Sequence, residues 1–137
     1  MAQELRITAG PYVFRARLED AAPVTCKAFQ ELLPFHNKII HVRWSGEAVW
    51  VPLGDSKITS EYENHTTYPS RGDILLYPGG ISETEILIAY GSTSFASKMG
   101  SLAGNHFLTI VDGLENLTAL GQRVLWEGAQ DILFEQL

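Results

Sequence analysis

The sequence has a single cysteine, Cys26, so no disulfide bond can form within one chain. No apolar run approaches the ~18 residues of a membrane-spanning helix, and the N-terminal residues lack the basic start and apolar run of a secretory signal. Basic residues are scarce, with 10 Lys and Arg against 16 Asp and Glu, for a net charge of −6. Because a nucleic-acid-binding face needs a basic stripe, this composition argues against such a partner. We expect a cytoplasmic protein that binds neither membrane nor nucleic acid.

The chain of 137 residues has the length of one ordinary domain, and 45% apolar residues suffice for one hydrophobic core. No internal repeat, low-complexity tract or linker divides it. We therefore expect a single domain over residues 1–137. Cys26 falls within an expected helix, where a lone cysteine is typically a small buried hydrophobic residue.

Most of the chain shows the alternation or the short apolar runs of β-strands. Residues 12–18 alternate from Tyr12 to Leu18, with apolar side chains on one face and Arg15 and Arg17 on the other. Further strands are expected at residues 5–8, 74–77, 85–90, 105–111, 124–126 and 131–135. Turn signals recur every ~8–12 residues, which favours an antiparallel barrel or sandwich over a parallel sheet. Closure into a barrel would remove exposed edges.

Two helices and one long polar stretch interrupt the strands. The first helix begins at Pro23, where a missing N–H is tolerated, and Pro34 ends it. Its expected buried face comprises Val24, Ala28, Phe29, Leu32 and Leu33. The second helix covers residues 114–120, with Gly121 as its C-terminal cap. Residues 54–72 are expected to form a long excursion with some strand in it.

The clearest hairpin covers residues 39–51, because Ser45-Gly46 separates two strand-like runs. If the loop has two residues, His41 lies opposite Trp50. That register buries the apolar face and places His41, Arg43 and Trp50 together on the other face.

The trio of His41, Arg43 and Trp50 favours a ligand that is planar and bears a carboxylate. A guanidinium binds a carboxylate through two parallel hydrogen bonds, and an indole offers a stacking surface. A solvated barrel exterior or an interface between subunits explains the trio equally well, since Arg and Trp are common at interfaces.

The segment 94–106 (SFASKMGSLAGNH) offers a hydroxyl, a cation, an amide and an imidazole in Ser97, Lys98, Asn105 and His106. A hydrolase would need the nucleophile within hydrogen-bonding reach of the imidazole and a third group to orient it. Spacing within a loop does not establish that arrangement. Turn geometry and attachment of the loop to a strand form the alternative, and a part in a binding pocket is favoured over catalysis.

Two other groups of residues carry side chains suited to chemistry. In an extended backbone, Glu61, Glu63 and His65 would face one side, as a divalent metal requires. No second histidine stands at ligand-like spacing, so we expect a solvated loop and no metal. The hydroxyls of Tyr77 and Tyr90, which end adjacent strand runs, are expected at the barrel rim, where packing with a satisfied hydroxyl is the usual role.

Three stretches resemble the cyclophilin-like fold. EDAAPVT at 19–25, followed by Phe29, resembles the start of the first cyclophilin helix, and GNHFLTIVDGLE at 104–115 resembles the segment G-K-H-x-x-F-G-x-V-x-E-G-M. The middle of the chain, WSGE at 44–47 through Pro52, GDI at 72–74 through YP at 77–78, and Tyr90-Gly91, is more similar to minimal bacterial cyclophilin-like barrels of unknown function. The resemblance implies a mainly β fold: a closed antiparallel cyclophilin-like β-barrel with two short helices.

Cyclophilins isomerise X–Pro bonds, and the resemblance matches Arg43 to their strand arginine and His106 to their histidine. The family's F-H-R-x-x-x-x-F-x-x-Q-G-G-D motif is absent, and Ser101 replaces its tryptophan. The apolar proline pocket is therefore not supported, and prolyl isomerisation is a minor alternative.

The favoured hypothesis is a cyclophilin-like barrel that binds, or binds and transforms, a small anionic metabolite. The expected ligand-binding residues are His41, Arg43, Trp50, Tyr90, Phe95, Lys98, Asn105 and His106, with Arg43 and His106 as the candidates for catalysis. The alternatives are a homo-oligomeric structural or binding module without catalysis, and a residual peptidyl-prolyl isomerase. A homo-oligomer is expected and no cofactor is; whether the protein is an enzyme stays open.

Overall fold

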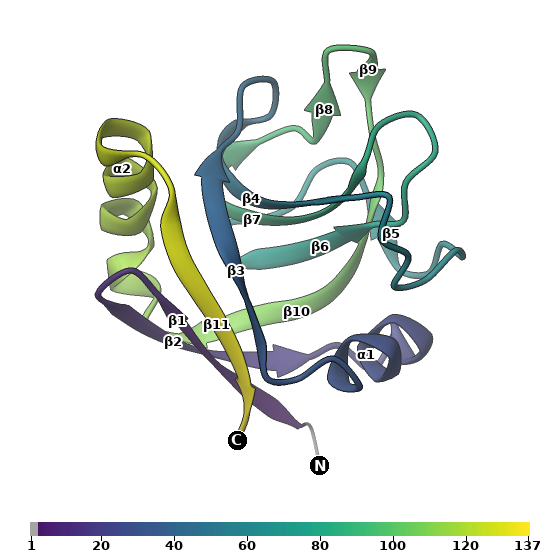
Figure 1. Cartoon of the computed structure of the whole chain (residues 1–137), viewed down its shortest axis with the longest axis horizontal. Helices are drawn as coiled ribbons and strands as arrows, with labels where there is room; N and C mark the ends of the chain where they lie inside the picture. The colour runs from purple at the N-terminus through teal and green to yellow at the C-terminus, as the bar shows by residue number, and fades with distance from the viewer. Residues whose placement is uncertain (1–2) are drawn as a thin grey trace.

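The computed structural model describes residues 3–137, and its strands wrap into a barrel against which two α-helices pack (Figure 1). The strands are β1 (Glu4–Ala9), β2 (Tyr12–Leu18), β3 (Phe35–His41), β4 (Gly46–Gly54), β5 (His65–Thr66), β6 (Asp73–Tyr77), β7 (Thr84–Thr93), β8 (Ala96–Ser97), β9 (Gly100–Ser101), β10 (Gly104–Asp112) and β11 (Gln130–Gln136). The helices are α1 (Pro23–Gln30), the 3₁₀ turn η1 (Leu114–Asn116) and α2 (Leu117–Glu127).

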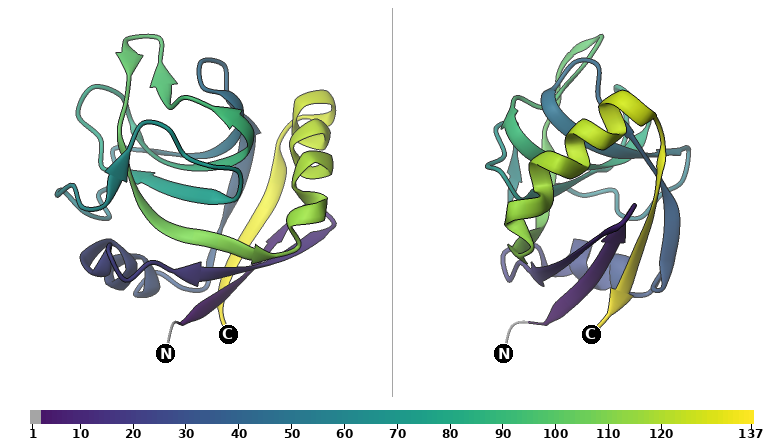
Figure 2. Two further views of the ribbon diagram at one scale, coloured as in Figure 1. Left: turned by 180° about the vertical axis from the view of Figure 1, so that it is seen from behind. Right: turned by 90° about the vertical axis from the view of Figure 1, so that its left-hand side faces the viewer.

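The main sheet closes on itself through antiparallel pairs. Its order is β2-β1-β11-β3-β4-β7-β6-β10, with β5 beside β10, and β10 also pairs with β2 to complete the ring. The separate β8–β9 hairpin projects from one end of the barrel (Figure 2). This architecture confirms the expected closed antiparallel β-barrel with two helices.

Alternating side chains fill the barrel interior. In β2, Phe14, Ala16 and Leu18 are buried, whereas Val13 is 54% exposed, as the sequence pattern predicts. The interior cluster takes residues from every strand of the ring and from both α-helices. The two helices therefore cover the core at separate places, and they lie apart in both views of Figure 2.

A second apolar cluster lies on the outer face of β4, β6 and β7. This outer cluster comprises Ala48, Leu75, Tyr77, Leu87, Phe95 and Leu102. The cover comes from the segment between β7 and β10, where the N–H of Leu102 donates to the carbonyl of Phe95 (2.9 Å). Because β6 and β7 are buried on both faces, their sequences are nearly continuous apolar runs.

Helix α1 begins at Pro23, as expected. Its buried residues are Thr25, Cys26 and Phe29, which confirms the expectation that Cys26 is buried. Val24 and Leu32 were wrongly expected on the buried face; they are 54% and 44% exposed. The helix packs against β10, and its buried face has fewer of the apolar residues than its sequence pattern predicted.

The second helix extends further than expected. It begins as η1 and continues as α2 to Glu127, so the strand expected at residues 124–126 is wrong. Gly121 lies inside α2 rather than at its end, so the expected cap is wrong. A glycine is needed there because the ring of Tyr90 packs where a Cβ would stand. Within residues 3–137, no helix is long and apolar enough to span a bilayer.

The excursion between β4 and β6 contains only the short strand β5, in keeping with the expected long connection with some strand. Its residue Glu63 reaches back to α1, where its carboxylate accepts hydrogen bonds from the N–H groups of Val24 (3.4 Å) and Thr25 (2.6 Å). The excursion thus satisfies free donors at the start of the helix.

Candidate functional site

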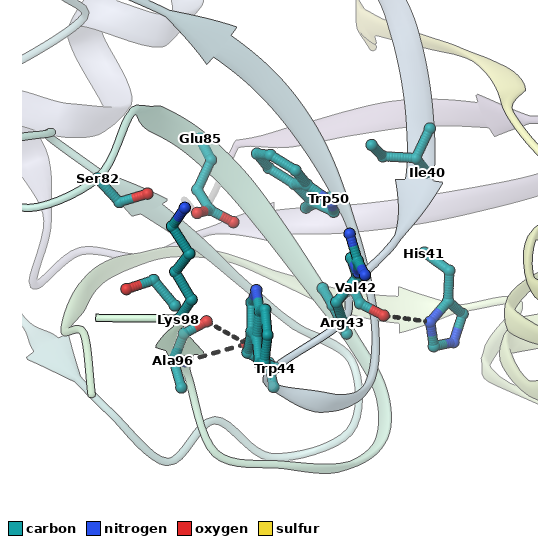
Figure 3. Close-up of a pocket in the computed structure, with 12 residues that line it drawn as sticks. Ile40, His41, Val42, Arg43, Trp44, Trp50, Ser82, Glu85, Ala96 and Lys98 are labelled. Atoms are coloured by element: carbon teal, nitrogen blue, oxygen red, sulfur yellow. Dashed lines mark hydrogen bonds between the residues drawn. The ribbon is translucent and has the colours of Figure 1, made fainter. Parts of the chain in front are cut away.

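A groove opens on the outer side of the barrel, between the β3–β4 loop and the β8–β9 hairpin (Figure 3). Its cavity measures about 240 Å³, and its walls are residues 40–45, Trp50, Ser82, Glu85 and residues 96–98. Pockets for drug-sized ligands usually measure roughly 300–1,000 Å³. The groove therefore suits a smaller molecule.

Ser45 fastens the two sides of the groove to each other. Its hydroxyl donates to the carbonyl oxygen of Ala96 (3.1 Å) and accepts from the N–H of the same residue (3.0 Å). The N–H of Ser94 donates to the carbonyl of Ser45 (2.9 Å). Ser45 is buried, so these bonds are shielded from water. The loop and the hairpin are therefore held in one relative position.

The β3–β4 hairpin differs from the expected register by one residue. Ile40 pairs with Trp50 and His41 with Val49, whereas the sequence predicted His41 opposite Trp50. The connection spans residues 42–45 instead of two residues. A shift of one residue moves side chains to the opposite face of a strand. Trp50 consequently faces the groove beside Ile40, while His41 lies on the inner face beside the buried Val49.

His41 supports the groove from the inner side. Its Nδ1 lies 2.8 Å from the carbonyl oxygen of Val42, and its Nε2 lies 2.8 Å from the hydroxyl of Tyr90. Figure 3 shows the imidazole turned away from Arg43 and from the hollow. Burial, reinforced by the charge of Glu47, raises the pKa of Tyr90, which keeps its hydroxyl a donor. The expected register is therefore wrong, but His41, Arg43 and Trp50 all line the same cavity.

Cationic and aromatic side chains surround the hollow. The guanidinium carbon of Arg43 lies 5.8 Å from the centre of the Trp44 ring, within cation–π range. Trp44 is 55% exposed, and Trp50 is half-buried against the outer cluster. Figure 3 shows Lys98 extending from the hairpin on the side across from Arg43. Arg43 belongs to the loop after β3, not to a strand as the resemblance implied.

Sequence reasoning missed Glu85, the carboxylic acid of the groove. It is 7% exposed, and its carboxyl group has no hydrogen bond or ion pair within residues 3–137. Burial, with a contribution from the charge of Glu83, raises the pKa of Glu85 to about 8. The one available signal was a glutamate at the start of the long apolar run of β7, where a charged residue is rarely buried without a partner.

Asn105 lies in the interior and does not line the groove. It is 0% exposed, and its side-chain amide donates to the hydroxyl of Thr25 (3.1 Å) and to the carbonyl of Glu61 (2.9 Å). Its side-chain oxygen accepts from the N–H of Glu63 (3.1 Å). Asn105 thus joins β10, α1 and the β4–β6 excursion.

His106 belongs to a different polar cluster. Its Nε2 lies 2.8 Å from the hydroxyl of Thr109 and 3.3 Å from a carboxylate oxygen of Asp73, and the Thr109 hydroxyl donates to Glu19 (2.9 Å). Burial opposes ionisation of Glu19, but hydrogen bonds from Thr109 and Arg17 outweigh it and lower the pKa of that carboxyl.

The expected pocket between the 41–50 hairpin and residues 95–106 is therefore only partly assembled. Lys98 lines the groove, whereas Asn105, His106 and the fully buried Phe95 do not. Phe95 packs edge-on against Tyr77, with ring centres 5.8 Å apart, inside the outer cluster. Arg43 and His106, which the cyclophilin resemblance paired, do not share a cavity.

Glu61, Glu63 and His65, which an extended backbone would place on one side, do not come together as a ligand set. Glu63 is engaged with α1, while Glu61 and His65 are exposed. Within the described part of the chain, no group of three or more His, Cys, Asp or Glu side chains is placed to hold a metal ion.

Comparison with known families decides the classification. A family model described as "Protein of unknown function (DUF3830)" matches residues 5–136. The chain belongs to the DUF3830 family. A comparison with curated proteins finds no match for this DUF3830 sequence.

Solved structures establish the fold of this DUF3830 chain. A structure of McbB in complex with tryptophan is similar with a TM-score of 0.70 and 18% identity, over 96% of this chain and 44% of McbB. The hypothetical protein AF2241 from Archaeoglobus fulgidus gives a TM-score of 0.66 and 17% identity, over 99% of this chain and 95% of AF2241. A cyclophilin-type peptidyl-prolyl cis-trans isomerase from Cryptosporidium parvum gives 0.54 and 20%, over 88% and 85%.

These similarities confirm the cyclophilin-like fold and a family of unknown function, as the sequence resemblance implied. At identities of 17–20% they concern the fold alone. The DUF3830 chain also spans less than half the length of McbB.

Proposed function

We propose that the groove binds a small molecule that joins a carboxylate to a planar apolar body. The observation that carries this proposal is the meeting of Arg43, Trp44 and Trp50 around one cavity. The two hydrogen bonds between Ser45 and Ala96 join the walls of that cavity.

The chemistry of the walls matches the two parts of such a ligand. A guanidinium recognises a carboxylate through two parallel hydrogen bonds, and Lys98 adds a second positive charge as a flexible point contact. Indole rings offer flat apolar surfaces for stacking. The overall acidity of the chain, −6, makes two cations at one cavity a local feature that favours an anion.

The relative McbB supports the choice of ligand class, because its structure was solved in complex with tryptophan. Tryptophan combines a carboxylate with a planar ring. The contacts proposed for the present groove come from its own residues.

The proposal is for binding and assigns no reaction. His41 and Tyr90 enter it as residues that position the loop, and Lys98 as a second contact to the anion. Phe95, Asn105 and His106 are left out because they do not line the cavity.

Binding of 3-phenylpropionate, followed by isothermal titration calorimetry, tests the proposal. Arg43→Ala is expected to weaken binding about tenfold or more, since it removes a charge-assisted pair. Arg15→Ala is the matched control, because Arg15 is an exposed arginine of β2 outside the groove. Absence of binding to the wild-type protein, or equal affinity in wild type and Arg43→Ala, would contradict the proposal.

A further inference from the structure

Glu85 is a buried carboxylic acid directed into the groove without a partner. Only 7% of the residue is exposed, and within residues 3–137 its carboxyl group forms neither a hydrogen bond nor an ion pair. Figure 3 shows the carboxyl group at the edge of the hollow, on the same side as Lys98. Among residues 3–137 its oxygens are not fully buried unpaired atoms. They reach the cavity that Glu85 lines, where a bound molecule can contact them.

The groups that face Glu85 do not supply that partner. On β6, Tyr77 lies across from Glu85, but its hydroxyl accepts the N–H groups of Ile81 (2.9 Å) and Ser82 (3.2 Å). On β4, the residue across from Glu85 is Pro52, which has no side-chain charge.

The charged neighbours also leave Glu85 unpaired. Glu83, two residues earlier in the chain, adds only like charge. Arg43 lines the wall across from Glu85 and Lys98 lies on the same side as Glu85, and neither forms an ion pair with it. The groove therefore presents cations and an unmatched acid around the same apolar space.

We propose that the molecule bound in the groove is a zwitterion, with its carboxylate on Arg43, its protonated amine on Glu85 and its planar body between Trp44 and Trp50. This inference rests on the proposed function and narrows it to aromatic α-amino acids and close analogues. An ammonium group would satisfy the buried acid by a charge-assisted hydrogen bond. The 240 Å³ cavity accommodates a molecule of that size.

Protonation gives the proposal a distinctive signature. In the free protein, burial keeps Glu85 mostly protonated below about pH 8. An ammonium beside it favours the ionised form, so binding of an amino acid releases a proton, and affinity rises with pH by up to about tenfold per unit below that value. A carboxylate ligand without the amine favours the protonated form, so its affinity falls as the pH rises through about 8.

The test compares L-phenylalanine with 3-phenylpropionate, which differs only by the missing amine. Calorimetry from about pH 6 to about pH 8.5, in buffers of different ionisation enthalpy, measures both affinity and proton release. Glu85→Gln keeps the side-chain shape and removes the acid. Glu31→Gln, at the exposed end of α1, is the matched control.

The expected result is opposite pH slopes for the two compounds. L-phenylalanine should release a proton on binding, and Glu85→Gln should weaken its binding about tenfold while sparing 3-phenylpropionate. If 3-phenylpropionate binds through Arg43 but the affinity of L-phenylalanine does not rise with pH, or Glu85→Gln leaves both affinities unchanged, the zwitterion is overturned and the carboxylate site stands. If neither compound binds, both proposals are overturned.

Discussion

The hydroxyl of Tyr90 lies 2.8 Å from Nε2 of His41, and this contact joins the barrel wall to the loop of the groove. The other ring nitrogen, Nδ1, faces the carbonyl of Val42 at 2.8 Å. Because a carbonyl only accepts, Nδ1 carries the hydrogen in the neutral ring, and Nε2 accepts from Tyr90. Through His41, Tyr90 of β7 therefore holds Val42, the first residue of the loop, in position.

Removing the hydroxyl should loosen the loop without disturbing the wall. Tyr90→Phe is expected to lower the free energy of unfolding by about 1 kcal/mol, the net worth of one hydrogen bond, and to weaken 3-phenylpropionate binding. Urea denaturation and calorimetry measure the two effects. Tyr68→Phe, at a tyrosine that is 74% exposed, is the control. Equal stability and affinity in Tyr90→Phe and wild type would mean that the contact does not hold the loop.

The glycine inside α2 should reject even a methyl group. Alanine is normally better than glycine in a helix by about 1 kcal/mol, but a Cβ at Gly121 would overlap the ring of Tyr90. Overpacking costs about 1–3 kcal/mol, so Gly121→Ala should destabilise the protein. Thermal denaturation measures this, with Thr118→Ala on the exposed side of α2 as the control. A Gly121→Ala variant more stable than wild type would show that the packing is not tight.

Glu85 should make stability depend on pH. The pKa of its carboxyl rises from the ordinary 4.5 to about 8 in the folded protein, so folding favours the protonated form. Its contribution to stability is full below about pH 4.5 and is lost as the pH rises through about 8.

Replacement of Glu85 by glutamine should remove this loss of stability at high pH. Glu85→Gln is expected to exceed wild type in free energy of unfolding near pH 8 by at least about 1.4 kcal/mol, the worth of one pKa unit. Urea denaturation at a series of pH values measures the difference curve, and Glu31→Gln should give a flat one. A flat curve for Glu85→Gln as well would mean that the acid is ionised in the fold.

Asn105 should matter for folding and not for the ligand. Asn105→Ala removes the bonds to Thr25 and to the backbone of Glu61 and Glu63, and leaves buried polar groups without partners. A loss of about 2–3 kcal/mol is expected, with unchanged affinity for 3-phenylpropionate in the folded fraction. Asn116→Ala, at a residue without a side-chain capping bond, should cost less. Weaker ligand binding at full stability would place Asn105 in the site after all.

Self-association remains the second interpretation of the exposed Trp44. If the groove is a ligand site, Trp44→Ala should weaken 3-phenylpropionate binding and leave the molar mass in solution unchanged. Light scattering coupled to gel filtration measures that mass. Dissociation of an assembly by Trp44→Ala, with ligand affinity retained, would assign the surface to a subunit interface instead.

The barrel was predictable because its signals are local. Alternation in residues 12–18, the proline at the start of α1 and short apolar runs each report on a strand or a helix without reference to the rest of the chain. The resemblance at 104–115 added the order of the elements. Gly121 misled the prediction because its reason lies in Tyr90, a residue of a distant strand.

The candidate site was less predictable, because it depends on one residue of register and on a distant anchor. A two-residue turn at Ser45-Gly46 satisfied the local pattern, but Ser45 bonds instead to Ala96, which lengthens the connection. That shift turned His41 inward and left Arg43 in the loop. Glu85 was missed because it shares the cavity with Arg43 and Lys98, which come from distant segments of the chain.

The most direct test of the central claim is amide chemical-shift mapping by NMR during titration with 3-phenylpropionate. The proposed site predicts that the largest shifts occur at residues 42–45, Glu85 and residues 96–98, and that they disappear in Arg43→Ala. Shifts centred on Asp73, His106 and Thr109, or no saturable shifts at all, would contradict it.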